Sequence, residues 1–164
     1  MGRISFLRTL LLGIGNILMN DDAAGVLVVQ ALAEKFNFPE ELTLLDGGTL
    51  GLDILPYLEG IDRLLVVDAV ETGDPPGTLI RMTGDDIPLA LATKVSPHQM
   101  GLKDLLLVAD LQGYAPREMV LWGVQPGSIE MDIELSPEVA QSMGALQERV
   151  LEELENWGLK ALRK

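Results

Sequence analysis

The sequence contains no cysteine, few aromatic residues and little positive charge. The absence of cysteine excludes disulfides, thiol nucleophiles and thiolate metal ligands, and it suits a reducing cytoplasm. Aromatic residues form only 4% of the chain, so aliphatic side chains and seven Met must fill the core. Twelve basic residues against 25 acidic ones give a net charge of −13. This balance argues against binding to nucleic acid or to an anionic membrane surface, because both depend on Lys and Arg.

Several hydrolase signatures are also missing. The sequence has no Gly-x-Ser-x-Gly elbow, and its single histidine, His98, rules out a zinc-binding His-Glu-x-x-His helix. A Ser–His–Asp triad would have to use His98, and no nearby serine lies in a recognisable elbow. The apolar run at Thr9–Gly13 is too short to span a bilayer, so it predicts a buried strand. We therefore expect a cytoplasmic protein without a membrane segment.

The hydrophobic pattern alternates between strands and helices. The length of 164 residues suits one domain, 1–164. We expect strands at Thr9–Gly13, Leu42–Leu45, Arg63–Asp68, Thr78–Met82 and Met119–Val124. We expect helices at Asp22–Phe36, Leu50–Leu58, Gly101–Leu111 and, after an N-cap at Ser136, from Pro137 to Trp157, with a short helical turn near Pro88–Thr93.

The order of these elements predicts an α/β three-layer sandwich around a mostly parallel sheet. The turn ETGDPPG (71–77) is too short for a helical crossover. The strand that follows it, Thr78–Met82, should therefore run antiparallel to its predecessor or lie at an edge. The helix at Leu50–Leu58 contains Pro56 and should be short or kinked.

The loop after the first strand resembles half of a dinucleotide-binding turn. The GIG stretch at 13–15 matches the first two glycines of the fingerprint, and Asp46 ends the next strand, where a ribose-binding acid belongs. The third glycine position is Leu18, whose bulk should impede close packing of helix and strand. Asp21 and Asp22 near the start of the helix would repel a pyrophosphate. A nucleotide-binding α/β module therefore stays as an alternative.

Four acids follow strands whose carboxyl ends should share one edge of the sheet: Asp21, Asp22, Asp46 and Asp68. In open α/β sheets, ligands bind at that edge. Asp68 follows four consecutive apolar residues, and a buried acid is costly unless it is hydrogen-bonded, paired or used in function. The structural alternative is a carboxylate that caps a neighbouring loop through backbone N–H groups. Several acids at one edge favour function.

His98 lies shortly before the helix expected from Gly101. A helix N-terminus disfavours the imidazolium form, so we expect a neutral imidazole there, the form that can bind a metal ion. Together with Asp22 and Asp68, His98 offers two carboxylates and one imidazole, a set that suits a divalent first-row ion with open positions. The spacing between the three is long, so topology allows them to meet but periodicity does not show it.

Five segments of the sequence together resemble the nickel–iron hydrogenase maturation proteases. In order along nearly the whole chain they are GIGNILMNDDAAGV, LLDGGTLG, LLVVDAV with PPGT after it, KVSPHQMGLKDLL, and WGVQPGSIE followed by LSPEV. The resemblance implies a twisted five-stranded sheet between helices. It also implies an aspartic-type processing endopeptidase that removes a C-terminal extension from the precursor of the hydrogenase large subunit.

The resemblance further implies a site. The metal positions of the family correspond to Asp22, Asp68 and His98, and the family often has Glu where this chain has Asp22. Asp46 falls in a DGG motif implicated in processing. By the same resemblance we expect the nickel to belong to the substrate, although other divalent ions can occupy such a site.

Two mechanisms stay open for catalysis by these acids. A metal-bound water can attack a polarised carbonyl, or a carboxylate, with Asp46 as the candidate, can act as general base. A non-catalytic nickel-sensing partner of the hydrogenase is the remaining alternative.

Overall fold

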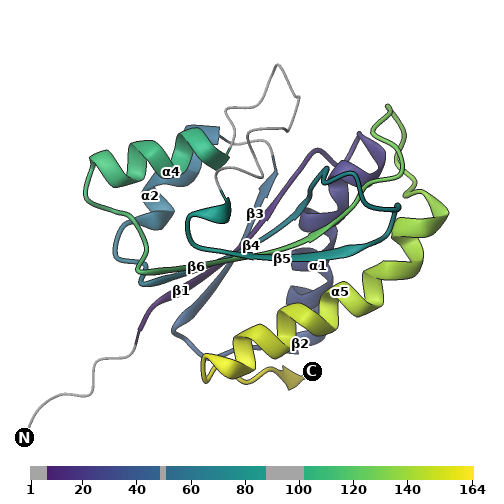
Figure 1. The fold of residues 1–164 in the computed structure, drawn as a ribbon. Helices are drawn as coiled ribbons and strands as arrows, with labels where there is room; N and C mark the ends of the chain where they lie inside the picture. The colour runs from purple at the N-terminus through teal and green to yellow at the C-terminus, as the bar shows by residue number, and fades with distance from the viewer. Residues whose placement is uncertain (1–6, 49–50, 88–101) are drawn as a thin grey trace, which may run out of the picture.

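The computed structural model describes residues 7–48, 51–87 and 102–164, and these residues form a central sheet with helices on both faces (Figure 1). Within this part of the chain the sheet has five strands in the order β3-β1-β4-β6-β5. The strands are β1 (Thr9–Ile14), β3 (Leu42–Gly48), β4 (Arg63–Ala69), β5 (Leu79–Thr83) and β6 (Glu118–Val124). The predicted α/β three-layer sandwich is confirmed.

The strand directions also agree with the prediction. β1 pairs in parallel with β3 and β4, and β4 pairs in parallel with β6. β5 lies at the edge of the sheet and runs antiparallel to β6, as expected for a strand reached by a short turn. Four parallel strands therefore end at the same edge, and the loops that follow them lie close together.

Helices pack on both faces of the sheet, and each face has a separate hydrophobic core. The helices are α1 (Ala24–Lys35), α2 (Leu55–Leu58), α4 (Leu102–Leu111) and α5 (Pro137–Asn156). In β4, Leu65 and Val67 pack in the core under α1 and α5, while Leu64 and Val66 pack in the core under α2 and α4. This alternation is the period-two pattern of a strand buried on both faces. The alternation therefore shows to which face of the sheet each side chain of β4 points, including those at its carboxyl end.

The remaining differences from the prediction are local. A 3-10 helix, η1 (Asn20–Ala23), precedes α1, which begins two residues later than expected. The short helix expected around Pro56 is a 3-10 turn, η2 (Gly51–Ile54), followed by the single turn of α2. A small antiparallel ribbon of β2 (Phe36–Asn37) and β7 (Leu162–Arg163) was not predicted, because two-residue strands carry no periodicity. The turn predicted near Pro88–Thr93 lies outside the described residues.

Candidate active site at the carboxyl ends of the strands

Glycines bring the first loop onto the end of the central strand. A Cβ atom on Gly25 would collide with the carbonyl oxygen of Val67, so only glycine allows the start of α1 to lie against β4. Gly15 has a φ of 136°, and a Cβ there would collide with the carbonyl oxygen of Asp22. Backbone contact on both sides therefore places the turn that carries Asp22 beside Asp68, the residue after Val67.

The prediction that Leu18 impedes close packing of helix and strand is wrong. Leu18 lies in the loop before η1, its side chain is exposed, and it does not face the sheet. Because α1 begins only at Ala24, the position that requires close approach moves along the chain to Gly25. The charge argument against a pyrophosphate stands, since Asp21 and Asp22 occupy the first turn of η1.

Asp22 and Asp68 are both buried at this edge. The backbone N–H of Asn16 donates to Oδ2 of Asp22 at 2.9 Å, which holds the carboxylate within its own loop. The N–H of Ala69 donates to Oδ1 of Asp68 at 2.8 Å. Asp68 has the same parity in β4 as Leu64 and Val66 and therefore points towards the face covered by α2 and α4. The structure thus brings two of the three predicted metal ligands to one end of the sheet.

Asp21 has a different role from that of its neighbour. Its carboxylate is completely buried and accepts four hydrogen bonds. The N–H groups of Gly127 and Ser128 donate to Oδ2 at 2.7 and 2.9 Å. The N–H and hydroxyl of Ser136 donate to Oδ1 and Oδ2 at 2.8 and 2.7 Å. Asp21 therefore fixes the loop between β6 and α5, the structural alternative that sequence analysis had kept open for a single acid.

Asn20 strengthens the same connection. It is the described non-glycine residue with a positive φ, 44°. Its side-chain amide donates to the carbonyl of Glu134 at 2.7 Å, and its side-chain oxygen accepts from the N–H of Glu130 at 2.7 Å. Its backbone N–H donates to the carbonyl of Asp132 at 2.9 Å. The loop after β6 is thus attached to the loop after β1 along several residues.

Ser136 begins α5 as predicted, but it does not cap the helix through its side chain. Its backbone is extended, and Pro137 follows at the first helical position. The hydroxyl is instead used on Asp21, 2.7 Å away. The sequence pattern identified the helix start correctly and could not show that a buried carboxylate competes for the hydroxyl.

Asp46 lies apart from Asp22 and Asp68. It is exposed, and the side-chain amide of Gln30 in α1 donates to it at 2.8 Å. In the sheet register Asp46 pairs with Gly13, and Gly13 pairs with Val67 on its other side. Two strand spacings therefore separate Asp46 from β4, a distance of about 10 Å. Asp46 also faces the α1 side of the sheet, opposite to the side that Asp68 addresses. Asp46 therefore lies at the same edge of the sheet as Asp68 but on the opposite face.

The third predicted ligand, His98, lies outside the described residues. Among the residues that the structure does describe, no group of three or more His, Asp or Glu side chains could hold a metal ion. The described chain therefore contributes two buried oxygen donors, Asp22 and Asp68, to the predicted set.

Sequence reasoning missed Gln125, which follows β6 at the same edge. The side chain is buried, and its oxygen accepts from the N–H of Thr72 at 2.8 Å. Its amide donates to Glu71 at 2.8 Å. Gln125 thus holds the loop that leaves Asp68. Its only sequence signal is its place directly after the last parallel strand, an end to which no functional residue had been assigned.

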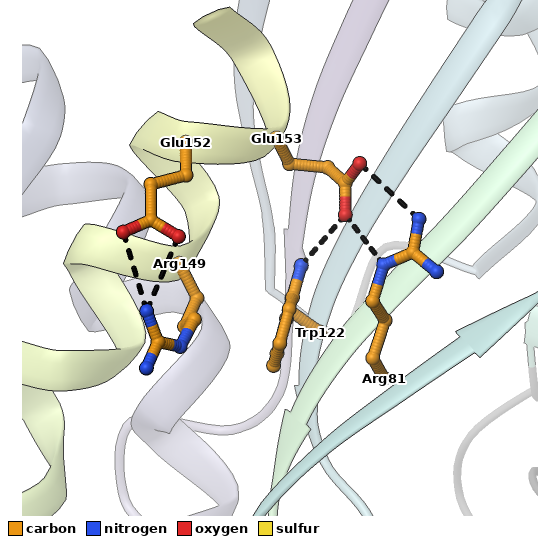
Figure 2. A network of polar contacts seen from close by, with 5 residues as sticks. All are labelled: Arg81, Trp122, Arg149, Glu152 and Glu153. Atoms are coloured by element: carbon orange, nitrogen blue, oxygen red, sulfur yellow. Dashed lines mark hydrogen bonds and ion pairs between the residues drawn. The ribbon is translucent and has the colours of Figure 1, made fainter. Parts of the chain in front are cut away.

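A separate carboxylate, Glu153 of α5, joins that helix to the sheet (Figure 2). Arg81 of β5 donates from Nε to Glu153 at 2.7 Å, and the indole of Trp122 in β6 donates to the same oxygen at 3.0 Å. The hydrogen bond from Arg81 lowers the pKa of Glu153, and the bond from Trp122 adds to this, against the opposing effect of burial. The same contact raises the pKa of Arg81. Trp122 therefore also joins β6 to α5 through a polar contact.

Comparison with known proteins identifies relatives over nearly the whole chain. The family model described as hydrogenase maturation protease matches residues 26–153. The hydrogenase 2 maturation protease of Escherichia coli K12 is 38% identical over 157 residues, covering 95% of this chain and 96% of its own. A hydrogenase expression/formation protein, HupD, of Rhodobacter capsulatus is 42% identical over 158 residues, covering 95% of this chain and 75% of its own.

Solved structures agree with these matches. The hydrogenase maturating endopeptidase HybD from E. coli superimposes with a TM-score of 0.91 at 36% identity, covering 96% of this chain and 98% of its own. Within the described residues, no helix combines the length and apolar character that crossing a membrane requires. The family model spans most of the chain, and the relatives and the solved structure cover 95% or more of it. The chain therefore belongs to the hydrogenase maturation protease family.

Proposed function

We propose that this protein is an endopeptidase that removes the C-terminal extension of the nickel-loaded precursor of a hydrogenase large subunit. Membership of the family supports the protease class. The observation that carries the site assignment is the contact of Gly25 with the carbonyl of Val67. This contact sets the turn that carries Asp22 against the strand end that carries Asp68, and both carboxylates are buried. A protein has reason to keep two buried acids together where they serve a cation.

The nickel in this proposal arrives as part of the substrate. Asp22, Asp68 and His98 are the residues that would hold it, and oxygen and imidazole donors suit such an ion. A bound divalent ion supplies Lewis acidity, which polarises a neighbouring carbonyl. His98 precedes α4 by four residues in the sequence, and α4 covers the face that Asp68 addresses. This arrangement supports the inclusion of His98 with the two acids.

The chain itself must supply a proton acceptor for the attacking water. A carboxylate within hydrogen-bond reach of that water can perform this role. Asp46 was the candidate base, and its place on the opposite face, bound to Gln30, favours Asp22 or Asp68 for the step instead. We therefore expect Asp46→Asn to lower processing by less than Asp68→Asn does.

Mass spectrometry of the purified precursor tests the proposal. The precursor is incubated, with and without nickel, with the wild-type protein and with the Asp68→Asn, His98→Ala and Asp46→Asn variants. We expect the nickel-loaded precursor to lose the mass of its extension with the wild-type protein, and the rate to fall by about 100-fold for Asp68→Asn and His98→Ala. Wild-type rates for both variants would show that the site is misassigned. A stable complex with an unchanged precursor mass would instead identify a nickel-sensing partner without protease activity.

A further inference from the structure

An exposed group of apolar side chains lies next to the acid-bearing turn and has no role in the site described so far. Two members belong to the loop before η1 and three to the loop between β6 and α5. We call them the apolar strip: Ile17, Leu18, Ile129, Met131 and Ile133. The side chain of Met131 is 87% exposed and that of Ile133 is 77% exposed. Large apolar side chains gathered at this exposure are typical of a binding surface.

Backbone hydrogen bonds hold the two halves of the strip together. Met19 and Asp132 form a parallel bridge. The N–H of Asp132 donates to the carbonyl of Leu18 at 3.0 Å, and the N–H of Asn20 donates back to Asp132 at 2.9 Å. The second loop projects beyond the start of α5 (Figure 1). Its exposed side chains are therefore presented by a backbone whose position is already fixed.

The buried carboxylate of Asp21 reinforces this arrangement. Burial of a carboxylate is unfavourable unless it is hydrogen-bonded, and here the hydrogen bonds fix the projecting loop. Asp21 accepts hydrogen bonds from Gly127, Ser128 and Ser136, which lie in sequence on either side of the projecting residues. A surface that is already ordered in the free protein loses less conformational entropy on binding, so it binds a partner more tightly than a flexible surface does. The strip is thus preorganised, and the same turn that anchors it continues directly into Asp22.

The charges around the strip define its partner. The apolar residues of the projecting loop alternate in sequence with Glu130, Asp132 and Glu134, all of them exposed. The range 125–136 contains no Lys or Arg, and the whole chain carries a net charge of −13. Charge complementarity therefore requires a partner with positive side chains beside its apolar ones, and it selects against acidic surfaces.

We propose that the apolar strip binds a segment of the hydrogenase precursor in which apolar side chains are flanked by Lys or Arg. This inference rests on the proposed function, because it takes the precursor as the partner. It assigns the strip to substrate docking: apolar contacts supply affinity, the acids select basic flanking residues, and the turn from Asn20 to Asp22 joins the docking surface to the active site.

Steady-state processing of the full-length precursor tests the docking surface. We expect Met131→Ser and Ile133→Ser each to raise KM by about tenfold at nearly constant kcat, since docking energy is the same in the ground and transition states. Leu111→Ser in α4 is the matched control. Its side chain is also 77% exposed, it lies at the end of a helix on the other face, and its KM should equal that of the wild type. Leu18→Ser is a second strip variant from the other loop.

A charge variant tests the partner's sign. Glu130→Lys combined with Glu134→Lys should raise KM and remove most of its dependence on salt concentration, because the attraction is between exposed charges. A KM unchanged by this double variant would overturn the requirement for basic flanking residues. Circular dichroism and the melting temperature show whether each variant is folded; all of these side chains are exposed, so the melting temperatures should match.

The outcomes separate the two proposals. If the wild-type protein cleaves the precursor and the strip variants have the wild-type KM, the docking surface is wrong and the proposed function stands. If the wild-type protein does not cleave, the proposed function fails. Equilibrium binding of the intact precursor then compares Ile133→Ser with Leu111→Ser, and equal affinities would overturn the docking surface as well. A wild-type dimer in sedimentation that Ile133→Ser converts to monomer, with KM unchanged, would assign the strip to self-association instead.

Discussion

Asp21 and Asp22 are identical residues, adjacent in sequence, buried and in the same turn of η1, yet they serve different parts of the molecule. Asp21 accepts four hydrogen bonds from the loop between β6 and α5, more than a hundred positions away along the chain. Asp22 accepts from Asn16 in its own loop and lies beside the end of β4. One carboxylate organises a distant loop, and the other belongs to the candidate active site.

The geometry of η1 explains how neighbours diverge. A 3-10 helix has three residues per turn, so successive side chains point about 120° apart. Two consecutive acids in such a turn cannot face the same partner. The paired aspartates of this loop are therefore not one acidic cluster but an anchor, Asp21, and a candidate metal ligand, Asp22, and we expect the two to respond to substitution in opposite ways.

Asp21→Ala should have the largest effect on stability. It leaves three backbone N–H groups and one hydroxyl without their buried acceptor, so we expect the free energy of unfolding to fall by about 3 to 5 kcal/mol. Urea denaturation at pH 7 measures this loss. An effect below about 1 kcal/mol would show that the carboxylate is not the anchor that its four hydrogen bonds indicate.

Ser136→Ala is a graded control for the same anchor. It removes the hydroxyl donor but keeps the backbone donor of Ser136 to Asp21. We expect a loss of about 1 kcal/mol, the usual cost of one hydrogen bond. A loss equal to that of Asp21→Ala would mean that the hydroxyl alone holds the loop.

Asp22 should show the opposite pattern, with activity more sensitive than stability. Asp22→Asn keeps an oxygen that can accept from Asn16, so the melting temperature should change little. Loss of the negative charge should lower processing by about 100-fold, whereas Asp22→Glu, which restores the carboxylate, should stay within about tenfold of the wild type. The precursor mass assay measures both. A wild-type rate for Asp22→Asn would remove Asp22 from the site.

Much of the fold was predictable because it depends on local patterns. The apolar run at β4 predicted a strand, and the turn at 71–77 predicted that β5 runs antiparallel or lies at an edge, since so short a connection cannot hold a helical crossover. The boundaries were less accurate where backbone geometry changes without a change in hydrophobicity, as at η1. The ribbon of β2 and β7 has two residues per strand and depends on the meeting of distant segments.

The site was predictable only in part, for a related reason. That Asp22 and Asp68 reach one edge follows from the parallel direction of β1 and β4, which the alternation of strands and helices predicts. That Gly25 and not position 18 makes the close contact depends on the loop and the 3-10 turn that precede α1, which hydrophobic periodicity does not show. The partners of Asp21 and the role of Gln125 depend on contacts across more than fifty residues, which no periodicity encodes.

Glu153 extends the comparison to a carboxylate anchored by side chains. Its pKa is lowered in the folded protein by the hydrogen bond from Arg81, so its ionised form stabilises the fold above the pKa of the unfolded chain, about 4.3. Glu153→Gln keeps an acceptor for Arg81 and Trp122 but loses the charge, and we expect it to cost about 1 kcal/mol at pH 7. The cost should stay constant down to about pH 5 and shrink as the pH falls further, because the wild-type carboxyl then takes up a proton and comes to resemble the amide.

Urea denaturation of both proteins at pH 7, 5, 4 and 3 measures the difference, in which the titration of all other carboxylates cancels. A difference that stays the same down to pH 3 would show that the amide costs stability through packing and not through charge.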